Sequence, residues 1–374
     1  MERPATFPDP VFVTKPMLPP LESYVEALHG IWERRWFTND GTLHLALEQS
    51  LVAQLRVPYL VLVNNGTMAL LLALKALDVS GEVITTPFTF PATTEVVTWS
   101  GGTPVFADID DKTLTLDPDS VERAISPRTS AILAVHVYGI PCDVDALGAI
   151  ATRHGLKLIY DGAHAFGTER RGESILGYGD ATTLSFHATK LFHTAEGGGI
   201  VTRSENLKRR LDSLRNFGLR DEKVVMPGIN GKLNELQAAL GLANLAFVAQ
   251  ERFARGAVGD IYRGRLSLLD GVTCVTAPPD VVSSDQYFAI RIHGRRSRDE
   301  LFEAFKTYNV FTRRYFYPLC SSFEFYRDLP SALPANLPNA HRVADEVLCL
   351  PFYGSLGTNS AERICDIITY EMRR

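Results

Sequence analysis

The chain has 374 residues, a length that predicts two domains of ordinary size or one large domain with an appendage. Hydrophobic residues make up 45% and charged residues 22%, a composition typical of a soluble globular protein. A net charge of −5 argues against a nucleic-acid or acidic-membrane partner, which would favour a basic surface. Five widely spaced cysteines form no Cys-x-x-Cys pair, and the nine histidines include no His-Glu-x-x-His motif. We therefore expect neither a metal site nor a disulfide framework.

The first ten residues, MERPATFPDP, lack the layout of a signal peptide. No apolar run approaches the roughly 20 residues that are needed to span a bilayer. We therefore expect a cytoplasmic protein whose thiols are reduced.

From about residue 40 to residue 250, short β-branched runs alternate with helical stretches. Alternation of this kind predicts an α/β fold in which helices cover both faces of a mostly parallel sheet. Buried strands are predicted at 59–65, 82–88, 103–109, 130–139, 156–162 and 181–187, and helices at 67–77, 92–101, 143–155 and 205–218.

A long helical stretch at 234–266 leads into a different pattern, with a strand at 287–293 and a helix near 298–308. We expect an N-terminal arm and a large domain over residues 1–250, and a smaller C-terminal α+β domain over residues 251–374.

A basic cluster comes just before this last helix. Arg295, Arg296 and Arg298 are followed at once by Asp299 and Glu300. Because acidic residues balance the arginines, we interpret the cluster as a solvated helix start.

Asn65, Gly66 and Thr67 follow the first predicted strand and open a helix. A helix N-terminus offers unpaired N–H groups and the positive end of the helix dipole, which suit a single phosphate. The alternative is an ordinary strand-to-helix turn that is capped by Thr67.

Asp161 stands at the end of the apolar strand LKLIYD and precedes Gly162, Ala163 and His164. A carboxylate at this edge of a parallel sheet lies where such folds bind ligands. Facing a ring nitrogen, it would keep that nitrogen protonated, as a pyridoxal ring requires. The alternative is an N-cap aspartate for a following helix.

Lys190 ends the run that begins at Ser185, and a glycine-rich turn over residues 196–199 comes next. A lysine held near a sheet edge and partly desolvated has a lowered pKa, which makes its amine a nucleophile and a base. A solvated surface lysine is the alternative. Together with the phosphate-type turn and the acid, Ser185 and Lys190 outline a site for pyridoxal phosphate.

These residues resemble the DegT/DnrJ/EryC1/StrS family of sugar aminotransferases, pyridoxal-phosphate enzymes with the aspartate aminotransferase fold (fold type I). The resemblance runs over nearly the whole chain. It is carried by WFT (36–38), NNGTMALLLAL, ITTPFTFPATT, PVFADIDDKTLTLDP, AVHVYGIPCDVDAL, YDGAHAFG, SFHATKLFHTAEGGGIVT, NGKLNELQAALGLANL and TRRYFYPL.

The resemblance implies a role for each matching residue. Lys190 would bind the cofactor covalently and carry the proton, and Asp161 would pair with the pyridine nitrogen. The phosphate would be held by Gly66, Thr67 and Ser185, while Phe90 would stack on the ring and His164 would lie beside its phenolic oxygen.

The family also implies a homodimer with shared active sites. Lys232, or alternatively Asn230, occupies the position from which relatives send a polar or basic side chain to the partner's phosphate. The residues that resemble the segment near the nucleotide sugar are Arg313, Arg314, Tyr315 and Tyr317, and packing of the small domain is an equal alternative for each of them.

The resemblance further implies an activity. Family dehydrases carry histidine in place of the Schiff-base lysine, so Lys190 favours transamination. The sequences of these motifs most resemble those of enzymes that aminate C4 of dTDP-4-keto-6-deoxyglucose with glutamate. One departure is Phe88, which replaces a residue that is usually smaller in the family. The alternatives are amination at C3, a UDP- or GDP-linked keto sugar, and a non-catalytic regulatory or binding relative.

Overall fold

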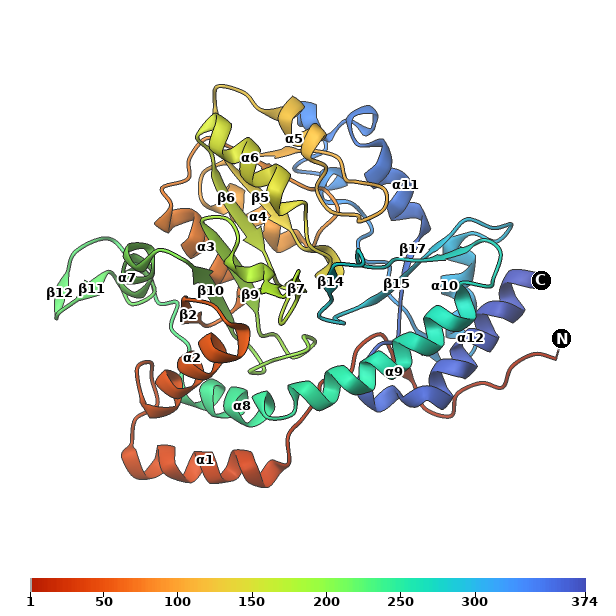
Figure 1. Ribbon diagram of the computed structural model, residues 1–374, viewed down its shortest axis with the longest axis horizontal. Helices are drawn as coiled ribbons and strands as arrows, with labels where there is room; N and C mark the ends of the chain where they lie inside the picture. The colour runs from red at the N-terminus through yellow and green to blue at the C-terminus, as the bar shows by residue number, and fades with distance from the viewer. Residues whose placement is uncertain (1) are drawn as a thin grey trace.

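The computed structural model describes residues 2–374, and its centre is a seven-stranded sheet (Figure 1). The strands, in spatial order, are β2 (Tyr59–Val63), β10 (Gly198–Thr202), β9 (Ala181–Ser185), β6 (Lys157–Asp161), β5 (Thr129–Val135), β3 (Glu82–Thr85) and β4 (Thr103–Phe106). In this sheet β10 runs in the direction opposite to that of the other six strands. The predicted α/β fold with a mostly parallel sheet is confirmed.

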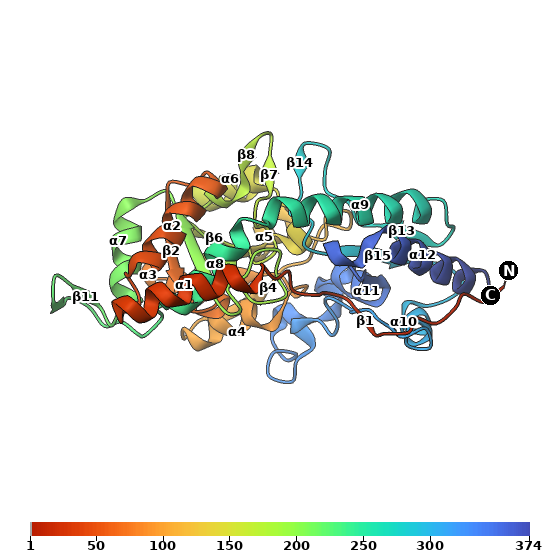
Figure 2. The same ribbon diagram turned by 90° about the horizontal axis from the view of Figure 1, so that it is seen from below.

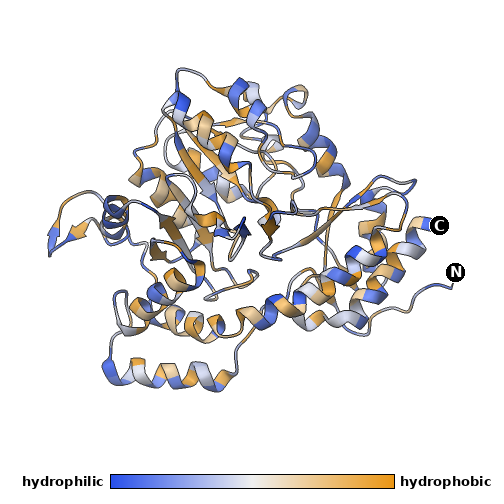
Figure 3. Cartoon of the chain, in the orientation of Figure 1, coloured by the Kyte–Doolittle hydropathy of each residue, from blue (hydrophilic) through white to orange (hydrophobic). Residues whose placement is uncertain are grey.

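Helices cover both faces of the sheet because its strands are apolar on both sides. Along β2, Leu60 and Leu62 belong to one hydrophobic cluster, whereas Val61 and Val63 belong to another. The first cluster is covered by α2 (Thr42–Leu55), α5 (Pro118–Ala124), α6 (Val144–His154) and α8 (Glu235–Leu245), and the second by α3 (Gly66–Ala76), α4 (Pro91–Trp99) and α7 (Glu205–Leu214). Figure 3 shows the apolar character of the central strands.

Three expectations about element boundaries were wrong. The glycine-rich run 196–199 was expected to be a turn, but Gly198 and Gly199 begin strand β10. A Cβ on Gly198 would lie 2.6 Å from the Asn65 carbonyl oxygen, so glycine is required where this strand passes the loop before α3. The strand predicted at 130–139 ends at Val135, because residues 137–139 form a 3₁₀ turn.

The helical stretch at 234–266 is divided into α8 and α9 (Val248–Leu266). At the division, the Phe247 amide donates to the Asn244 carbonyl, three residues back, so the last turn of α8 tightens before α9 begins. Helix α9 then runs from the large sheet towards the C-terminal part of the chain (Figure 1).

The C-terminal part is built on a second sheet of β13 (Val272–Cys274), β15 (Phe288–Ile292) and β17 (Val347–Leu350), packed with α9, α10 (Arg298–Lys306) and α12 (Gly357–Arg373). The N-terminal arm joins it, since β1 (Val11–Phe12) pairs with β16 (Val310–Phe311). The C-terminal part has a hydrophobic cluster of its own, against which the arm packs, and this supports our proposal of two domains, 1–250 and 251–374. A further cluster, which includes Phe88, Val135, Phe316 and Cys349, joins the two parts.

The remaining elements lie around these two sheets. Helix α1 (Leu21–Arg34) packs on α8, and β14 (Val281–Val282) pairs with β7 (Glu169–Arg170), which also pairs with β8 (Glu173–Ser174). The hairpin of β11 (Leu219–Arg220) and β12 (Lys223–Val224) projects from the end of the molecule opposite to both termini (Figure 2). Within residues 2–374, no helix is both long and apolar enough to cross a membrane.

The solvated helix start expected at Arg295, Arg296 and Arg298 is only partly observed. Ser297 caps α10 as predicted for a helix start, but Arg298 is only 2% exposed. Its guanidinium donates to the carbonyl oxygens of Ala344 at 2.8 Å and Val347 at 3.0 Å. Ala344 lies in the last turn of α11 (Pro338–Glu346), where carbonyls lack partners within the helix, and Val347 follows that helix directly, so the buried guanidinium caps the end of α11.

Asp108 joins the large domain to the other end of α11. Its carboxylate accepts the amides of Asn339 at 3.0 Å and Ala340 at 2.9 Å. These amides belong to the first turn of the helix, where a negative charge is favourable.

We expect Asp108→Ala to lower the free energy of unfolding by about 1.5–3 kcal/mol, the value of a hydrogen bond to a charged group. Thermal unfolding followed by circular dichroism measures the change. The control is Asp328→Ala, because the Asp328 side chain is 92% exposed. Equal melting temperatures for the two variants would contradict the role given to Asp108.

Candidate active site

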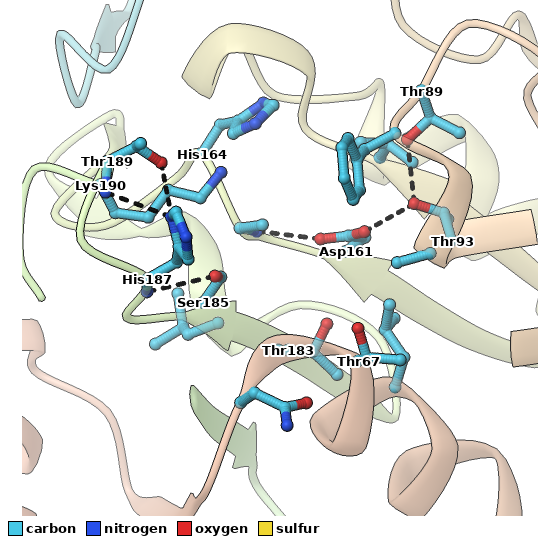
Figure 4. Close-up of a pocket in the computed structure, with 18 of the residues that line it drawn as sticks. Thr67, Thr89, Thr93, Asp161, His164, Thr183, Ser185, His187, Thr189 and Lys190 are labelled. Carbon is cyan, nitrogen blue, oxygen red and sulfur yellow. Dashed lines mark hydrogen bonds between the residues drawn. The ribbon is translucent and has the colours of Figure 1, made fainter. Parts of the chain in front are cut away.

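A cavity of about 270 Å³ lies where the parallel strands of the large sheet end (Figure 4). The large domain supplies most of its wall, from the ends of β6 and β9 and the starts of α3 and α4. Tyr287, Tyr315 and Phe316 close it from the C-terminal part of the chain. This edge is the expected location of a ligand site in an α/β fold.

One end of the cavity is suited to a phosphate. Gly66 and Thr67 begin α3, and Ser185 stands opposite them at the end of β9. A Cβ on Gly66 would lie 2.9 Å from the Ser185 Cβ, so only glycine leaves this approach open. The helix cap is Asn65, whose Oδ1 accepts the Met68 amide at 2.8 Å, and therefore the Thr67 hydroxyl does not serve as the cap.

Asp161 lies further along the same cavity, at the end of β6. Its Oδ1 accepts the Ala163 amide at 3.0 Å, and its Oδ2 accepts the Thr93 hydroxyl at 2.8 Å. Burial raises the pKa of Asp161, while these two bonds and the charge of Lys190 oppose the rise. The N-cap alternative is excluded, because residues 162–167 form turns and not a helix.

Lys190 lies across the cavity from Asp161, on the loop between β9 and β10 (Figure 4). Its Nζ is 5.9 Å from the centroid of the Tyr287 ring. Burial lowers the pKa of Lys190 to about 8, and the Asp161 carboxylate opposes this effect. About half of the amine is therefore neutral near pH 8, a pH at which a solvated surface lysine is almost fully protonated.

Gln286 holds the loop that carries Lys190. Its side-chain carbonyl accepts the Leu191 amide at 2.8 Å, and its side-chain amide donates to the Thr189 carbonyl at 3.0 Å. These two bonds bracket Lys190 on both sides. A residue of the C-terminal part thus fixes a loop of the large domain.

His164 is a neutral hydrogen-bond donor in this environment. Its Nδ1 accepts the Tyr138 amide at 3.2 Å, which leaves the proton of the neutral ring on Nε2. Burial lowers the pKa of His164 well below its usual value, and Lys190 lowers it further. The ring lies parallel to Phe316, with their centroids 6.0 Å apart, and edge-on to Tyr287.

Of the other predicted site residues, Phe90 and Tyr315 line the cavity. Phe90 is 59% exposed at the start of α4. Arg313, Arg314 and Tyr317 are not among the lining residues; the Arg314 guanidinium contacts Asp299 at 3.0 Å and lies 4.9 Å from the centre of the Tyr317 ring. The backbone of Arg313 pairs with Cys349.

Asn230 and Lys232 lie outside the cavity of their own chain, beside the base of the β11–β12 hairpin. Lys232 Nζ donates to the Asn216 side chain at 3.1 Å and lies 4.3 Å from the centre of the Phe217 ring. The Asn230 backbone pairs with that of Asn216. Their role at a partner's cofactor stays a proposal.

Five residues of the site were not singled out by the sequence patterns: Thr89, Thr93, Tyr287, Phe316 and Gln286. Thr89 and Thr93 lie within the motif ITTPFTFPATT, in which the resemblance gave a role at the site only to Phe90. Their four-residue spacing at a helix start was the available signal, since it places both hydroxyls on one side. The other three come from distant parts of the chain and carry no local signal.

Comparison with known proteins identifies this architecture. The sequence model of the DegT/DnrJ/EryC1/StrS aminotransferase family matches residues 21–369. The chain belongs to this family.

Two relatives are dTDP-4-amino-4,6-dideoxy-D-glucose transaminases. The Shigella dysenteriae protein is 45% identical over 364 residues, and the Escherichia coli protein 41% over 366. Each alignment covers 96% of this chain and 98% of the relative. The crystal structure of DesI in the presence of its TDP-sugar product superposes with a TM-score of 0.94 at 36% identity, covering 99% of this chain and 95% of DesI.

The protein is accordingly an aminotransferase that depends on pyridoxal phosphate, and the expected family, fold and cofactor are confirmed. Its cavity fits that cofactor. The glycine-lined start of α3 leaves room for the phosphate, and Asp161 and Lys190 stand at opposite sides of the space for the ring.

The lowered pKa of Lys190 makes the rate of cofactor binding a test of the site. We expect covalent incorporation of pyridoxal phosphate into cofactor-free protein to accelerate as the pH rises through about 8 and then to level off. The reason is that only the neutral amine attacks a carbonyl. Stopped-flow absorbance measures the rate.

Lys190→Ala is the control, and borohydride should attach no cofactor to it. A rate that keeps increasing beyond pH 10, as expected for an ordinary lysine, would contradict the burial effect.

Proposed function

We propose that this aminotransferase transfers the amino group of glutamate to C4 of dTDP-4-keto-6-deoxyglucose, with 2-oxoglutarate as the coproduct. The observation that carries the proposal is the 45% and 41% identity to two dTDP-4-amino-4,6-dideoxy-D-glucose transaminases over 96% of this chain. The similarity to DesI, whose product is a TDP-sugar, is consistent with it.

Each residue of the cavity has a chemical task in this proposal. Bound pyridoxal phosphate supplies an electron sink for the pair of electrons left when a substrate carbon loses its proton. Lys190 takes up that proton from the substrate carbon at Nζ and passes it to the cofactor. The Asp161 carboxylate keeps the pyridine nitrogen protonated, and the Nε2–H group of His164 donates a hydrogen bond to the phenolic oxygen of the cofactor. The phosphate is bound by the start of α3 and by Ser185.

The nucleotide provides binding energy away from the reacting carbon. Tyr315 is the candidate nearest the reaction, because it lines the cavity. We propose that Arg313, Arg314 and Tyr317 contact the diphosphate or the base further out, which requires Arg314 to exchange its contact with Asp299 for the ligand. Such remote contacts position the ketone for attack, so the free sugar should be a poor substrate.

We also propose that the active form is a homodimer in the cytoplasm. The projecting hairpin and its base expose apolar side chains that a second copy would cover, with Val224 on the hairpin 71% exposed and Phe217 at its base 48% exposed. Trp32 and Trp36 are likewise half exposed at and just after the end of α1. A reduced compartment agrees with five cysteines that form no disulfide within residues 2–374.

The substrate is tested by incubating the enzyme with dTDP-4-keto-6-deoxyglucose, glutamate and pyridoxal phosphate. We expect NMR to locate the new C–N bond at C4. An amine at C3, or turnover only with a UDP- or GDP-linked sugar, would refute the substrate and leave the aminotransferase standing. No transfer to any keto sugar would favour a regulatory relative, a result that the presence of Lys190 and Asp161 argues against.

The shared site is tested with Lys232→Ala. If Lys232 reaches the partner's phosphate, we expect the cofactor dissociation constant to rise about tenfold, because a charge-assisted bond of roughly 1.5 kcal/mol is lost. Sedimentation should still show a dimer. Lys157→Ala, at an exposed strand start, is the control. An active monomer of the unmodified protein would overturn the proposal.

A further inference from the structure

Thr93 holds the carboxylate on which the proposed chemistry depends. Thr93 is completely buried in the first turn of α4, and its Oγ1 lies 2.8 Å from Asp161 Oδ2. The other carboxylate oxygen accepts the Ala163 amide at 3.0 Å. Each oxygen of Asp161 therefore has a donor fixed to a separate piece of backbone, the start of a helix and a turn.

Thr89 extends this contact into a chain of hydroxyl groups (Figure 4). Its Oγ1 lies 2.9 Å from that of Thr93, and Thr89 is also buried. An ionised carboxylate only accepts hydrogen bonds, so the single hydroxyl proton of Thr93 points towards Asp161. The Thr93 oxygen then accepts from Thr89, and donation runs in one direction from Thr89 through Thr93 to Asp161.

A one-way chain of this kind strengthens its last bond, because each hydroxyl polarises the next in a medium of low dielectric. Two fixed donors also hold the carboxylate in one orientation. Each oxygen keeps a free lone pair, so Asp161 can still accept a bond from a ligand in the cavity.

We propose that Thr93 is a positioning residue, whose hydroxyl, aligned by Thr89, fixes the orientation and preserves the negative charge of Asp161. The inference deepens the proposed function, because it rests on Asp161 facing the pyridine nitrogen. A neutral or rotated carboxyl would not keep that nitrogen protonated, and the electron sink would weaken.

The electrostatics of the cavity explain why this support is needed. Burial raises the pKa of Asp161, and the effects that oppose it are the bonds from Ala163 and Thr93 and the positive charge of Lys190. The charge of Lys190 is itself reduced by burial, so it is not a dependable counterion above pH 8. The two hydrogen-bond donors are a hydroxyl and a backbone amide, neither of which loses its proton near pH 8.

Thr93→Val tests the proposal, since valine keeps the shape of threonine and removes the hydroxyl. In cofactor-free protein labelled with ¹³C-aspartate, we expect the Asp161 carboxyl to titrate at higher pH than in the unmodified protein. Asp161→Asn assigns its resonance. With cofactor bound, the rate of the half-reaction with glutamate should fall about ten- to hundredfold, the equivalent of one hydrogen bond to a charged group, with little change in KM.

Three further variants make the result specific. Thr93→Ser restores the hydroxyl and should restore both the titration and the rate. Thr89→Val keeps the bond from Thr93 to Asp161 and removes only the hydroxyl that aligns it. The titration of Asp161 should therefore move to higher pH by a smaller amount than in Thr93→Val. Thr98→Val removes another hydroxyl from α4, one bonded to Tyr326 at 2.7 Å, and should change neither measurement.

An unchanged Asp161 titration in folded Thr93→Val protein would overturn the proposal. Should Thr93→Val fail to fold, the comparison of Thr89→Val with Thr98→Val decides in its place, and equal titrations there would also overturn it. Neither the titration nor the glutamate half-reaction requires a sugar nucleotide. The experiment therefore remains decisive even if the proposed sugar is wrong.

Discussion

The burial of one carboxylate and one amine in the same cavity governs the rest of the site. Burial alone drives both groups towards neutrality, since it raises the pKa of Asp161 and lowers that of Lys190. Transamination needs opposite outcomes at these two residues: a charged carboxylate and an amine that readily loses its proton. The chain resolves this conflict by giving Asp161 two hydrogen-bond donors, whereas Lys190 is buried beside the Tyr287 ring.

This balance requires precise contact between the two parts of the chain. Tyr287, Tyr315 and Phe316 close the cavity from the C-terminal side. The Gln286 side chain forms hydrogen bonds with the backbone on both sides of Lys190. Asp108 of the large domain binds the start of α11, so the two parts of the chain are joined at a second point outside the cavity. The low dielectric that lowers the pKa of Lys190 therefore depends on both parts of the chain together.

The sequence predicted the features that local patterns determine. Apolar runs and their spacing located the parallel strands, and strand-end positions placed Gly66, Asp161, Ser185 and Lys190 in one cavity. Strand β10 was missed because glycine has low strand propensity, and its need for glycine arises from the carbonyl of Asn65, far away in sequence. The burial of Arg298 and the bond from Thr93 to Asp161 likewise depend on partners that only the tertiary structure brings near.

Charge balance gives the physical reason for the proposed dimer. The described residues lining the cavity include Lys190 as a base with lowered pKa and a buried neutral His164, but no arginine. The cofactor phosphate, the nucleotide diphosphate and the carboxylates of glutamate would all enter this region with negative charge. A helix N-terminus contributes only about half an elementary charge. Cations from outside the cavity would compensate the remainder, and in the proposed dimer Lys232 of the second copy would supply one, with Arg313 and Arg314 as the proposed contacts of the nucleotide.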